Sequence, residues 1–450
     1  MDKPTPLARI LGLGFGLAMV FGGTVGVGIL RLPGTLAATL GDSRLVLLFW
    51  IVGGVYALLG AMSVAELAAM LPRAGGFYVY ARRAFGSGAG FVVGWSDWIN
   101  EVAALAYGSM TAMTFLASLW PVAARYARPG AVLVIVAFTA LHWVGLRMGS
   151  SLTRLISLSI GLMMLMLIVA CLFVPPAAHA AAPLAMSAAA LPLVSMATLA
   201  ALVSAMRSVL LTYDGWYSPI YLAEENTDPG RTLPRALIGG TVVLIALYVA
   251  INAALLRVLP LSALASSDLP AAAAARLVFP RGGGELVTLI ALLTVLSLVN
   301  ATLLLAPRVL FAIGRDGLFT RKAAAVSAGG TPRVALAVSS AAAIALILSG
   351  TFEQIIALAT VLFLLNYISA YAALFVLRRR EPDLPRPYRA FGFPFTSAIV
   401  LVGSVLALIA AVAEDRRSSL VALLLLAACA PVYAAIAHRK RSMEARAAAD

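Results

Sequence analysis

Long apolar runs dominate this chain of 450 residues and leave its backbone few ways to fold. A helix needs about 20 predominantly apolar residues to cross a hydrocarbon core of about 30 Å. A backbone in lipid must satisfy its own hydrogen bonds, and these runs lack the alternating pattern of a membrane β-barrel. The sequence therefore predicts an all-α polytopic membrane protein with twelve transmembrane helices, over residues 7–30, 45–70, 89–120, 129–146, 154–175, 194–222, 236–258, 285–310, 334–350, 353–377, 392–413 and 419–437.

The charged residues indicate how these helices are oriented. A net charge of +14 would suggest a nucleic-acid partner in a soluble protein, but only 12% of the residues are charged and 62% are hydrophobic. Most Lys and Arg residues fall in every second connection, which places both termini in the cytoplasm by the positive-inside rule. We therefore expect the lipid bilayer, and no nucleic acid, as a partner. Residues 1–6 lack a small-residue cleavage site and are expected to be retained.

The cysteines and the basic residues add two further expectations. Cys171 and Cys429 both fall in apolar spans, so neither a disulfide nor a metal site is implied. No cofactor is expected. The excess of Arg over Lys and the abundance of Ala are typical of a GC-rich bacterial genome, which predicts a multi-pass protein of the bacterial inner (plasma) membrane.

Two of the predicted spans contain helix-breaking interruptions. Gly22–Gly28 interrupts span 1, and Tyr213–Trp216, with Pro219 close behind, interrupts span 6. Unpaired backbone groups in lipid cost several kcal/mol each unless protein, water or ligand satisfies them. Broken helices at matching places in two halves of a membrane protein point to a substrate site. Each break opens a group of five helices, so the second group enters the membrane from the opposite side.

The interruptions and the connections carry a family resemblance. The chain resembles an amino acid–polyamine–organocation (APC) superfamily permease through motifs that occur in order: Gly26-Val27-Gly28-Ile29, Glu66-Leu67, Pro72 to Tyr80, Gly94-Trp95, Tyr213 to Trp216, Glu224-Glu225, Pro234-Arg235-Ala236, Asn300, Arg308, Arg315-Asp316-Gly317 and Arg386-Pro387-Tyr388-Arg389.

The resemblance implies a LeuT-type fold of twelve helices. Helices 1–5 (residues 7–175) and helices 6–10 (residues 194–377) would form a 5+5 inverted repeat with helices 1 and 6 broken, and residues 392–437 would hold two extra C-terminal helices. It also implies a secondary transporter that moves an amino acid by alternating access, as a proton-coupled symporter or an exchanger. The partners would be the amino acid and a proton or an exchanged amino acid.

An amino acid zwitterion needs donors for its carboxylate and acceptors for its ammonium, and broken helices offer both. Amides at a half-helix N-terminus favour an anion, which assigns the carboxylate to Thr24, Val25, Gly26, Val27 and Gly28. Freed carbonyls of the second break can accept from the ammonium, which assigns it and the cargo's side chain to Leu211, Thr212, Tyr213, Asp214, Gly215 and Trp216. Asp214 is expected either to touch substrate or tune the gate, or to cap the second half-helix.

Three residues depart from the family pattern. Val27 stands where relatives usually carry Ser or Thr, and Leu211 stands at a gating position that is commonly aromatic. Ile160 takes the place of a lysine that proton-coupled relatives often have in span 5. Either another group carries the proton, or transport is uncoupled exchange or facilitated diffusion.

Intramembrane polar residues supply candidates for coupling or gating. Asp97 and Glu101 are spaced i,i+4 and share one face of span 3. They could form a proton relay, or a water-exposed or hydrogen-bonded pair near the cytoplasmic third of the helix. Glu66 is expected to have a structural or gating role, and Asn300 matches a family position. Arg308 is expected to extend towards water, with a buried carboxylate as its partner in the alternative.

Other classes of protein fit less well. A transporter of polyamines or other organic cations, or an amino-acid-sensing receptor, would use the same pocket. An enzyme is not expected because the sequence shows no clustered nucleophile, metal or acid–base set, and a channel is disfavoured because no filter-like repeat is visible.

Overall fold

A computed structural model describes residues 7–177, 196–349 and 352–436, and these residues are arranged almost entirely as helices. An isolated bridge pairs Leu11 with Asn226. The helices are α1 (Leu13–Thr24), α2 (Gly28–Leu40), α3 (Ser43–Met70), α4 (Phe77–Phe85), α5 (Ser87–Leu119), η1 (Pro121–Tyr126), α6 (Ala127–Val144), α7 (Leu146–Leu172), α8 (Met196–Thr212), η2 (Ser218–Glu225), α9 (Pro229–Val258), α10 (Leu261–Ala265), α11 (Pro270–Val278), α12 (Gly283–Arg315), η3 (Arg321–Ala324), α13 (Arg333–Ser349), α14 (Phe352–Arg380), α15 (Phe395–Glu414) and α16 (Arg416–Ala427).

The prediction of an all-helical polytopic membrane protein is confirmed. Within the described ranges, nine helices are long and apolar enough to cross a membrane, and α1 and α2 add a tenth span that is bent by 46°. The apolar segment of α8 and helix α13 are shorter, with 10–17 residues each. The total of twelve spans and the inverted repeat stay predictions.

The first span ends later than its apolar pattern suggests. It was expected over residues 7–30, whereas α1 begins at Leu13 and α2 continues to Leu40. Pro33 lies inside α2, where its fixed φ suits a helix that began only a few residues earlier. The break therefore lies near the middle of the span, as a substrate site at the membrane midplane requires.

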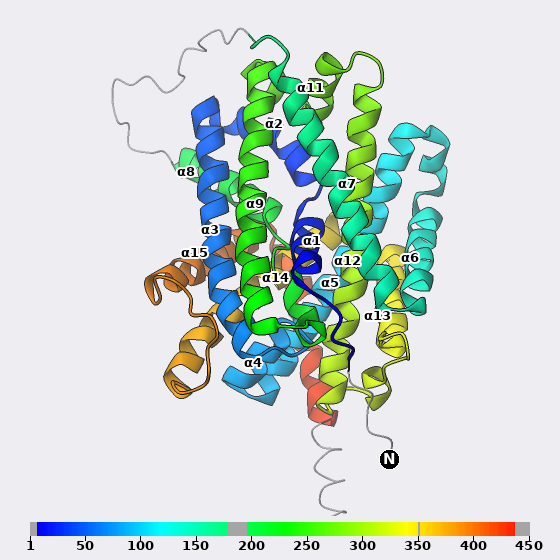
Figure 1. The fold of residues 1–450 in the computed structure, drawn as a ribbon, viewed down its shortest axis with the longest axis vertical. Helices are drawn as coiled ribbons and strands as arrows, with labels where there is room; N and C mark the ends of the chain where they lie inside the picture. Colours follow the sequence, from blue (N-terminus) through cyan, green and yellow to red (C-terminus); the bar gives the residue numbers. More distant parts are fainter. Residues whose placement is uncertain (1–6, 178–195, 350–351, 437–450) are drawn as a thin grey trace, which may run out of the picture.

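In the view of Figure 1, helix α1 lies between longer helices such as α9 and α7. It packs against α7, α9 and α12, while α5 and α12 pack along each other as the two longest helices, with 33 residues each. Helix α3 runs beside α9. The interrupted part of the chain is thus enclosed by continuous helices that hold its position.

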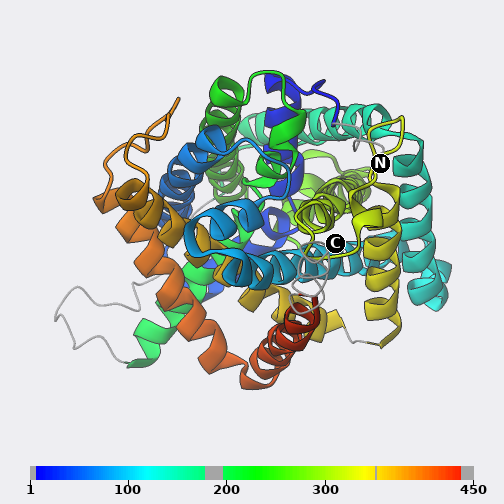
Figure 2. The same ribbon diagram turned by 90° about the horizontal axis from the view of Figure 1, so that it is seen from below.

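Helices α15 and α16 lie at the edge of the bundle (Figure 2). Both pack on α14, and α15 also touches α3. Their outward side chains are apolar, such as Ile399, Leu406 and Ile409, which is expected for a surface that faces lipid. These helices cover the central bundle without contributing to its interruptions.

The chain before α1 is fastened to the end of η2. The N–H groups of Ile10 and Leu11 both lie 3.0 Å from the carbonyl oxygen of Glu225, and the N–H of Thr227 donates to the carbonyl of Leu11 at 2.9 Å. The segments that flank the two interrupted spans are therefore linked outside the interruptions as well. Residues 1–6, which were expected to be retained, lie outside the described residues.

Two ion pairs join α12 to η2 at the end of the molecule predicted to be cytoplasmic. Arg308 lies 3.1 Å from Glu225, and both side chains are buried. Two helical turns further along α12, Arg315 lies 2.6 Å from Glu224, whose other contact is the N–H of Ala74. The expectation that Arg308 extends towards water is wrong, because η2 brings a carboxylate to it inside the protein.

Candidate functional site

The two interruptions pack directly against each other. Gly215 has a φ of 105° and lies so close to the carbonyl oxygen of Gly23 that a Cβ atom at residue 215 would overlap it. Gly28, at the start of α2, faces the side chain of Thr212, where a Cβ atom would lie 2.8 Å from the hydroxyl oxygen. Only glycine combines this φ with this close approach at residue 215. The end of α8 therefore lies against the gap between α1 and α2.

An aromatic group behind the interruptions fixes their spacing. The Tyr248 hydroxyl of α9 lies 3.1 Å from the carbonyl oxygen of Thr24 and 3.2 Å from that of Thr212, the last residues of α1 and α8. Trp50 and Tyr213 pack on the Tyr248 ring, with centroids 5.6 Å and 4.9 Å away. One phenol thus serves both helix ends, because each carbonyl of a helix terminus lacks an intrahelical donor.

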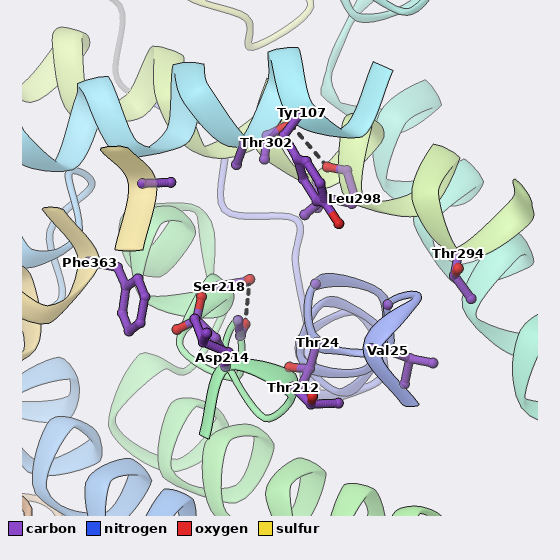
Figure 3. Close-up of a pocket in the computed structure, with 18 of the residues that line it drawn as sticks. Thr24, Val25, Tyr107, Thr212, Asp214, Ser218, Thr294, Leu298, Thr302 and Phe363 are labelled. Atoms are coloured by element: carbon purple, nitrogen blue, oxygen red, sulfur yellow. Dashed lines mark hydrogen bonds between the residues drawn. The ribbon is translucent and has the colours of Figure 1, made fainter. Parts of the chain in front are cut away.

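A cavity of about 310 Å³ opens beside the interruptions (Figure 3). This volume is near the lower end of the roughly 300–1,000 Å³ that ligand sites occupy. Helices α5, α12 and α14 form its other walls, through residues such as Tyr107, Thr302 and Phe363. The predicted substrate-binding residues that line it are Thr24, Val25, Gly26, Val27, Gly28, Leu211, Thr212, Asp214 and Gly215.

Two predicted residues point elsewhere. The Tyr213 hydroxyl donates to the carbonyl of Trp50 at 3.0 Å, on the side away from the cavity. Trp216 stacks on Tyr367 with ring centroids 5.6 Å apart and planes inclined by 4°. Neither side chain is among the cavity residues, so both act on the site through the backbone conformation and packing of the interruption.

The first interruption supplies hydrogen-bond donors to the cavity. The N–H groups of Gly26 and Val27 lie outside both half-helices and make no hydrogen bond with other described residues. The Thr24 hydroxyl is buried and also lacks a partner in the described part of the chain. These donors lie next to the N-terminus of α2, where the helix dipole favours negative charge. This wall of the cavity suits a carboxylate.

The second interruption supplies acceptors. The carbonyl of Leu211 accepts from the N–H of Asp214 at 3.3 Å, and that of Gly215 accepts from the hydroxyl of Ser218 at 2.7 Å (Figure 3). The Leu211 carbonyl oxygen has a second lone pair for another donor, whereas that of Gly215 also accepts from the N–H of Ser218 at 3.1 Å. We call residues 24–28 the donor wall and residues 211–212 and 214–215 the acceptor wall. Figure 3 shows Thr24 and Thr212 side by side, so the two walls adjoin.

Asp214 brings a carboxylate into the acceptor wall. The hydroxyl of Tyr367, on α14, donates to its Oδ1 at 2.6 Å. The half-helix η2 begins at Ser218, and no side chain caps its N-terminus by a hydrogen bond. Asp214 therefore does not cap the second half-helix. The carboxylate lies in the cavity wall near Ser218 and Phe363 (Figure 3).

Glu101 and Asp97 occupy successive turns of α5 at different depths. Glu101 is 2% exposed and lines the cavity, whereas Asp97 is fully buried behind it and is not a cavity residue. Asp97 accepts hydrogen bonds from the hydroxyl of Tyr221 at 2.6 Å and from the amide of Asn366 at 3.2 Å. The i,i+4 pair is therefore one carboxylate facing the cavity and one held by neighbouring side chains.

Glu66 lies in a separate polar cluster. Its carboxylate accepts from Arg378 at 2.9 Å and 2.5 Å, lies 3.2 Å from Arg386, and accepts from the N–H of Ala390 at 2.7 Å. These contacts fasten the connection between α14 and α15 onto α3. The position is compatible with the expected structural or gating role and excludes direct contact with the cavity in this conformation.

Ile160 and Asn300 are also not among the residues that line the cavity. Ile160 is fully buried on α7 in the apolar core. The Asn300 amide of α12 contacts the ring of His142 at 2.9 Å and donates to the Thr153 hydroxyl at 2.8 Å, which joins three helices. Among the described residues, no group of three His, Cys, Asp or Glu side chains is placed to hold a metal ion.

Sequence reasoning missed the contribution of α14 to the site. Phe363 lines the cavity and Tyr367, one turn later, bonds Asp214 across 153 residues of chain. Tyr248 of α9, which holds both interruptions, was missed as well. Aromatic residues inside apolar spans look alike in sequence, so nothing local distinguishes these three from residues that face lipid.

A bundle of apolar helices with a ligand-sized cavity beside two interruptions defines a polytopic integral membrane protein. Comparison with known proteins agrees. The family whose description is "Amino acid permease" matches residues 16–434. The chain belongs to this amino acid permease family, within the APC superfamily.

Several characterised relatives are similar over most of their length. The serine/threonine exchanger SteT of Bacillus subtilis is 27% identical, over 97% of this chain and 98% of its own. The branched-chain amino acid permease BcaP of Bacillus subtilis is 26% identical, over 88% and 86%. The b(0,+)-type amino acid transporter 1 of Mus musculus is 25% identical, over 92% and 84%. The family and these relatives are transporters, which supports amino acid transport as the general activity.

Proposed function

We propose that this protein is a secondary active transporter that moves an amino acid across the membrane by alternating access, as an exchanger or a symporter. The observation that carries the proposal is the meeting of the two interruptions at one cavity, with free N–H groups on one wall and carbonyl and carboxylate oxygens on the next. This pairing matches the two charged ends of an amino acid. Continuous helices would offer neither the free N–H groups nor the free carbonyl oxygens, because these groups pair with each other inside a helix.

The cargo would lie across the junction of the two walls. Its carboxylate would accept from the N–H groups around Gly26 and Val27, and its ammonium would donate to the Leu211 carbonyl and to Asp214. Its side chain would extend between α5, α12 and α14. Val27 lines the cavity but has no hydroxyl group that could donate to the carboxylate. The backbone amides and the Thr24 hydroxyl would therefore be its only donors.

The ion pairs between α12 and η2 support a conformation closed on one side. Arg308 with Glu225 and Arg315 with Glu224 join parts of the chain that alternating access must separate. We propose that residues 7–175 and 194–377 are the two inverted repeats, with residues 392–437 outside them. We also propose a bacterial inner membrane location with both termini cytoplasmic, so that these pairs close the cytoplasmic side.

Transport in proteoliposomes tests the proposal. Full-length protein would be reconstituted with an internal amino acid mixture and offered labelled amino acids and polyamines, with and without imposed pH and sodium gradients. We expect stimulation by internal amino acid for exchange, or gradient-driven accumulation for symport. Uptake of polyamines alone would contradict the amino acid assignment, and binding without any movement would indicate a receptor.

A matched pair of glycine variants ties transport to the interruptions. In Gly28→Ala the new methyl group would press on the Thr212 side chain, whereas Gly14 of α1 has open space around it. We expect Gly28→Ala to slow exchange at least tenfold and Gly14→Ala to leave it within twofold. Equal activity of the two variants, at equal amounts of folded protein, would refute the placement of the cargo site.

A further inference from the structure

The cavity has an unbalanced set of charged side chains. Glu101 from α5 and Asp214 from the second interruption both line it, and none of the described residues that line it is Lys, Arg or His. Two arginines of the core pair with other carboxylates: Arg308 with Glu225, and Arg378 with Glu66. Arg31 of α2 is exposed and interacts electrostatically with the cavity residue Tyr107, but does not itself line the cavity. Two carboxylates without a basic side chain among the cavity residues must be neutralised, either by a proton or by a cation in the cavity, because buried charges persist only when they are paired.

The two carboxylates differ in how fully the protein already satisfies them. Asp214 accepts a hydrogen bond from Tyr367 and lies beside the carbonyl groups at the end of α8. Glu101 lines the cavity from α5, and the Tyr217 hydroxyl is its neighbouring polar group. Asp97, by contrast, accepts from Tyr221 and Asn366 and lies outside the cavity. Phenols and amides support these carboxylates but supply no charge.

A neutral zwitterion would leave this arrangement incomplete. Its carboxylate is matched by the N–H groups of the first interruption, and its ammonium by Asp214 and nearby carbonyls. Glu101 would then need a proton, or would remain as an uncompensated carboxylate inside the membrane, which is costly. A second cationic group on the cargo would match the second carboxylate.

We propose, building on the function above, that the cargo is an amino acid with a positively charged side chain, whose distal cation is bound by Glu101 while its α-ammonium is bound at Asp214. The cavity is also lined by the apolar residues Val295, Leu298 and Leu305 of α12, which offer apolar surface for a methylene stem. A cavity of about 310 Å³ suits a single amino acid of this kind.

Charge-matched analogues test the inference on the full-length protein in proteoliposomes. L-Arginine and L-citrulline have nearly the same shape, but citrulline lacks the side-chain charge. We expect arginine to compete for uptake at least tenfold better than citrulline. In Glu101→Gln the advantage should disappear, with a loss of apparent arginine affinity of about thirtyfold or more, as is typical when one partner of a buried charge pair is removed.

The same amide substitution at an exposed position provides the control. Glu285 lies in the first turn of α12 and is exposed, so Glu285→Gln should preserve the preference for arginine. Gel filtration and thermal unfolding of each variant would establish equal folding.

Three results would overturn the inference. If citrulline competes as well as arginine, the cargo is neutral, and transport of neutral amino acids would leave the proposed function standing. If neutral amino acid uptake carries a proton that Glu101→Gln abolishes, Glu101 binds a proton in place of a cargo cation. If folded wild-type protein moves no amino acid at all, both the inference and the proposed function fail.

Discussion

The buried ion pair between Arg308 and Glu225 allows the energetic reasoning to be tested in detail. The two side chains are 2% and 0% exposed, and the guanidinium and carboxylate lie 3.1 Å apart. The other oxygen of Glu225 has no partner among the described residues, so Arg308 provides its main compensation. Arg308→Met should therefore leave an uncompensated buried charge, which typically costs about 3–5 kcal/mol of stability.

The expected change in melting temperature follows from the size of the chain. An unfolding entropy of about 2.1 cal/mol/K per residue gives roughly 0.95 kcal/mol/K for 450 residues. Arg308→Met should then lower Tm by about 3–5 °C in a thermal unfolding assay on purified protein. The double variant Arg308→Met with Glu225→Leu should recover most of this loss, because replacing a whole buried pair by apolar groups is often neutral or stabilising.

A surface pair supplies the control. Arg83 and Glu381 lie 2.8 Å apart, but their side chains are 52% and 27% exposed. Arg83→Met should cost less than about 1 kcal/mol, or about 1 °C. Two results would refute the role of this buried pair. One is a Tm of Arg308→Met equal to that of the wild type, and the other is a Tm decrease in the double variant equal to the sum of the decreases in the two single variants.

Three further substitutions follow from the packing of the site. Gly215→Ala should abolish exchange, because the new methyl group would overlap the Gly23 carbonyl oxygen. Gly317 also has a positive φ but has open space around it, so Gly317→Ala should retain activity and serves as the control. Tyr248→Phe removes the hydroxyl between the Thr24 and Thr212 carbonyls and should slow exchange about fivefold, consistent with about 1 kcal/mol for one hydrogen bond; unchanged rates would show that the phenol is not needed. Glu66→Gln removes the negative charge that pairs with the guanidinium groups of Arg378 and Arg386, and should lower Tm by about 3–5 °C. A higher Tm would contradict this expectation.

The sequence was sufficient to predict the helical membrane fold and the two interruptions. Apolar length identifies membrane spans because lipid forces the backbone into helices. Glycine and polar residues identify breaks such as Gly22–Gly28 because they oppose helix locally. These signals lie within one segment, and the structure has both breaks within a few residues of the expected positions.

The sequence could not show which distant side chains complete the site. The Tyr367 phenol reaches Asp214 across 153 residues, and Glu225 reaches Arg308 across 83. The second contact explains why an arginine expected near water is buried. Long-range pairing depends on how helices pack, and a single sequence contains no local signal for it.

The split between Asp97 and Glu101 shows the same limit. Their spacing correctly places them on one face of α5, because side chains four residues apart point the same way. Which of them faces the cavity depends on Tyr221 and Asn366, which reach only Asp97. Whether either carries a proton stays a prediction.

Thiol labelling of the donor wall tests the central claim most directly. Cys171 and Cys429 are buried, so a Cys171→Ala and Cys429→Ala background would leave Val27→Cys as the reactive thiol. A membrane-impermeant maleimide would be applied to proteoliposomes from outside or from inside, with and without the transported amino acid. Residue 27 should react from both sides, and the amino acid should slow both reactions. Labelling from one side alone, or at rates that the amino acid leaves unchanged, would contradict a cargo site that opens alternately to the two sides.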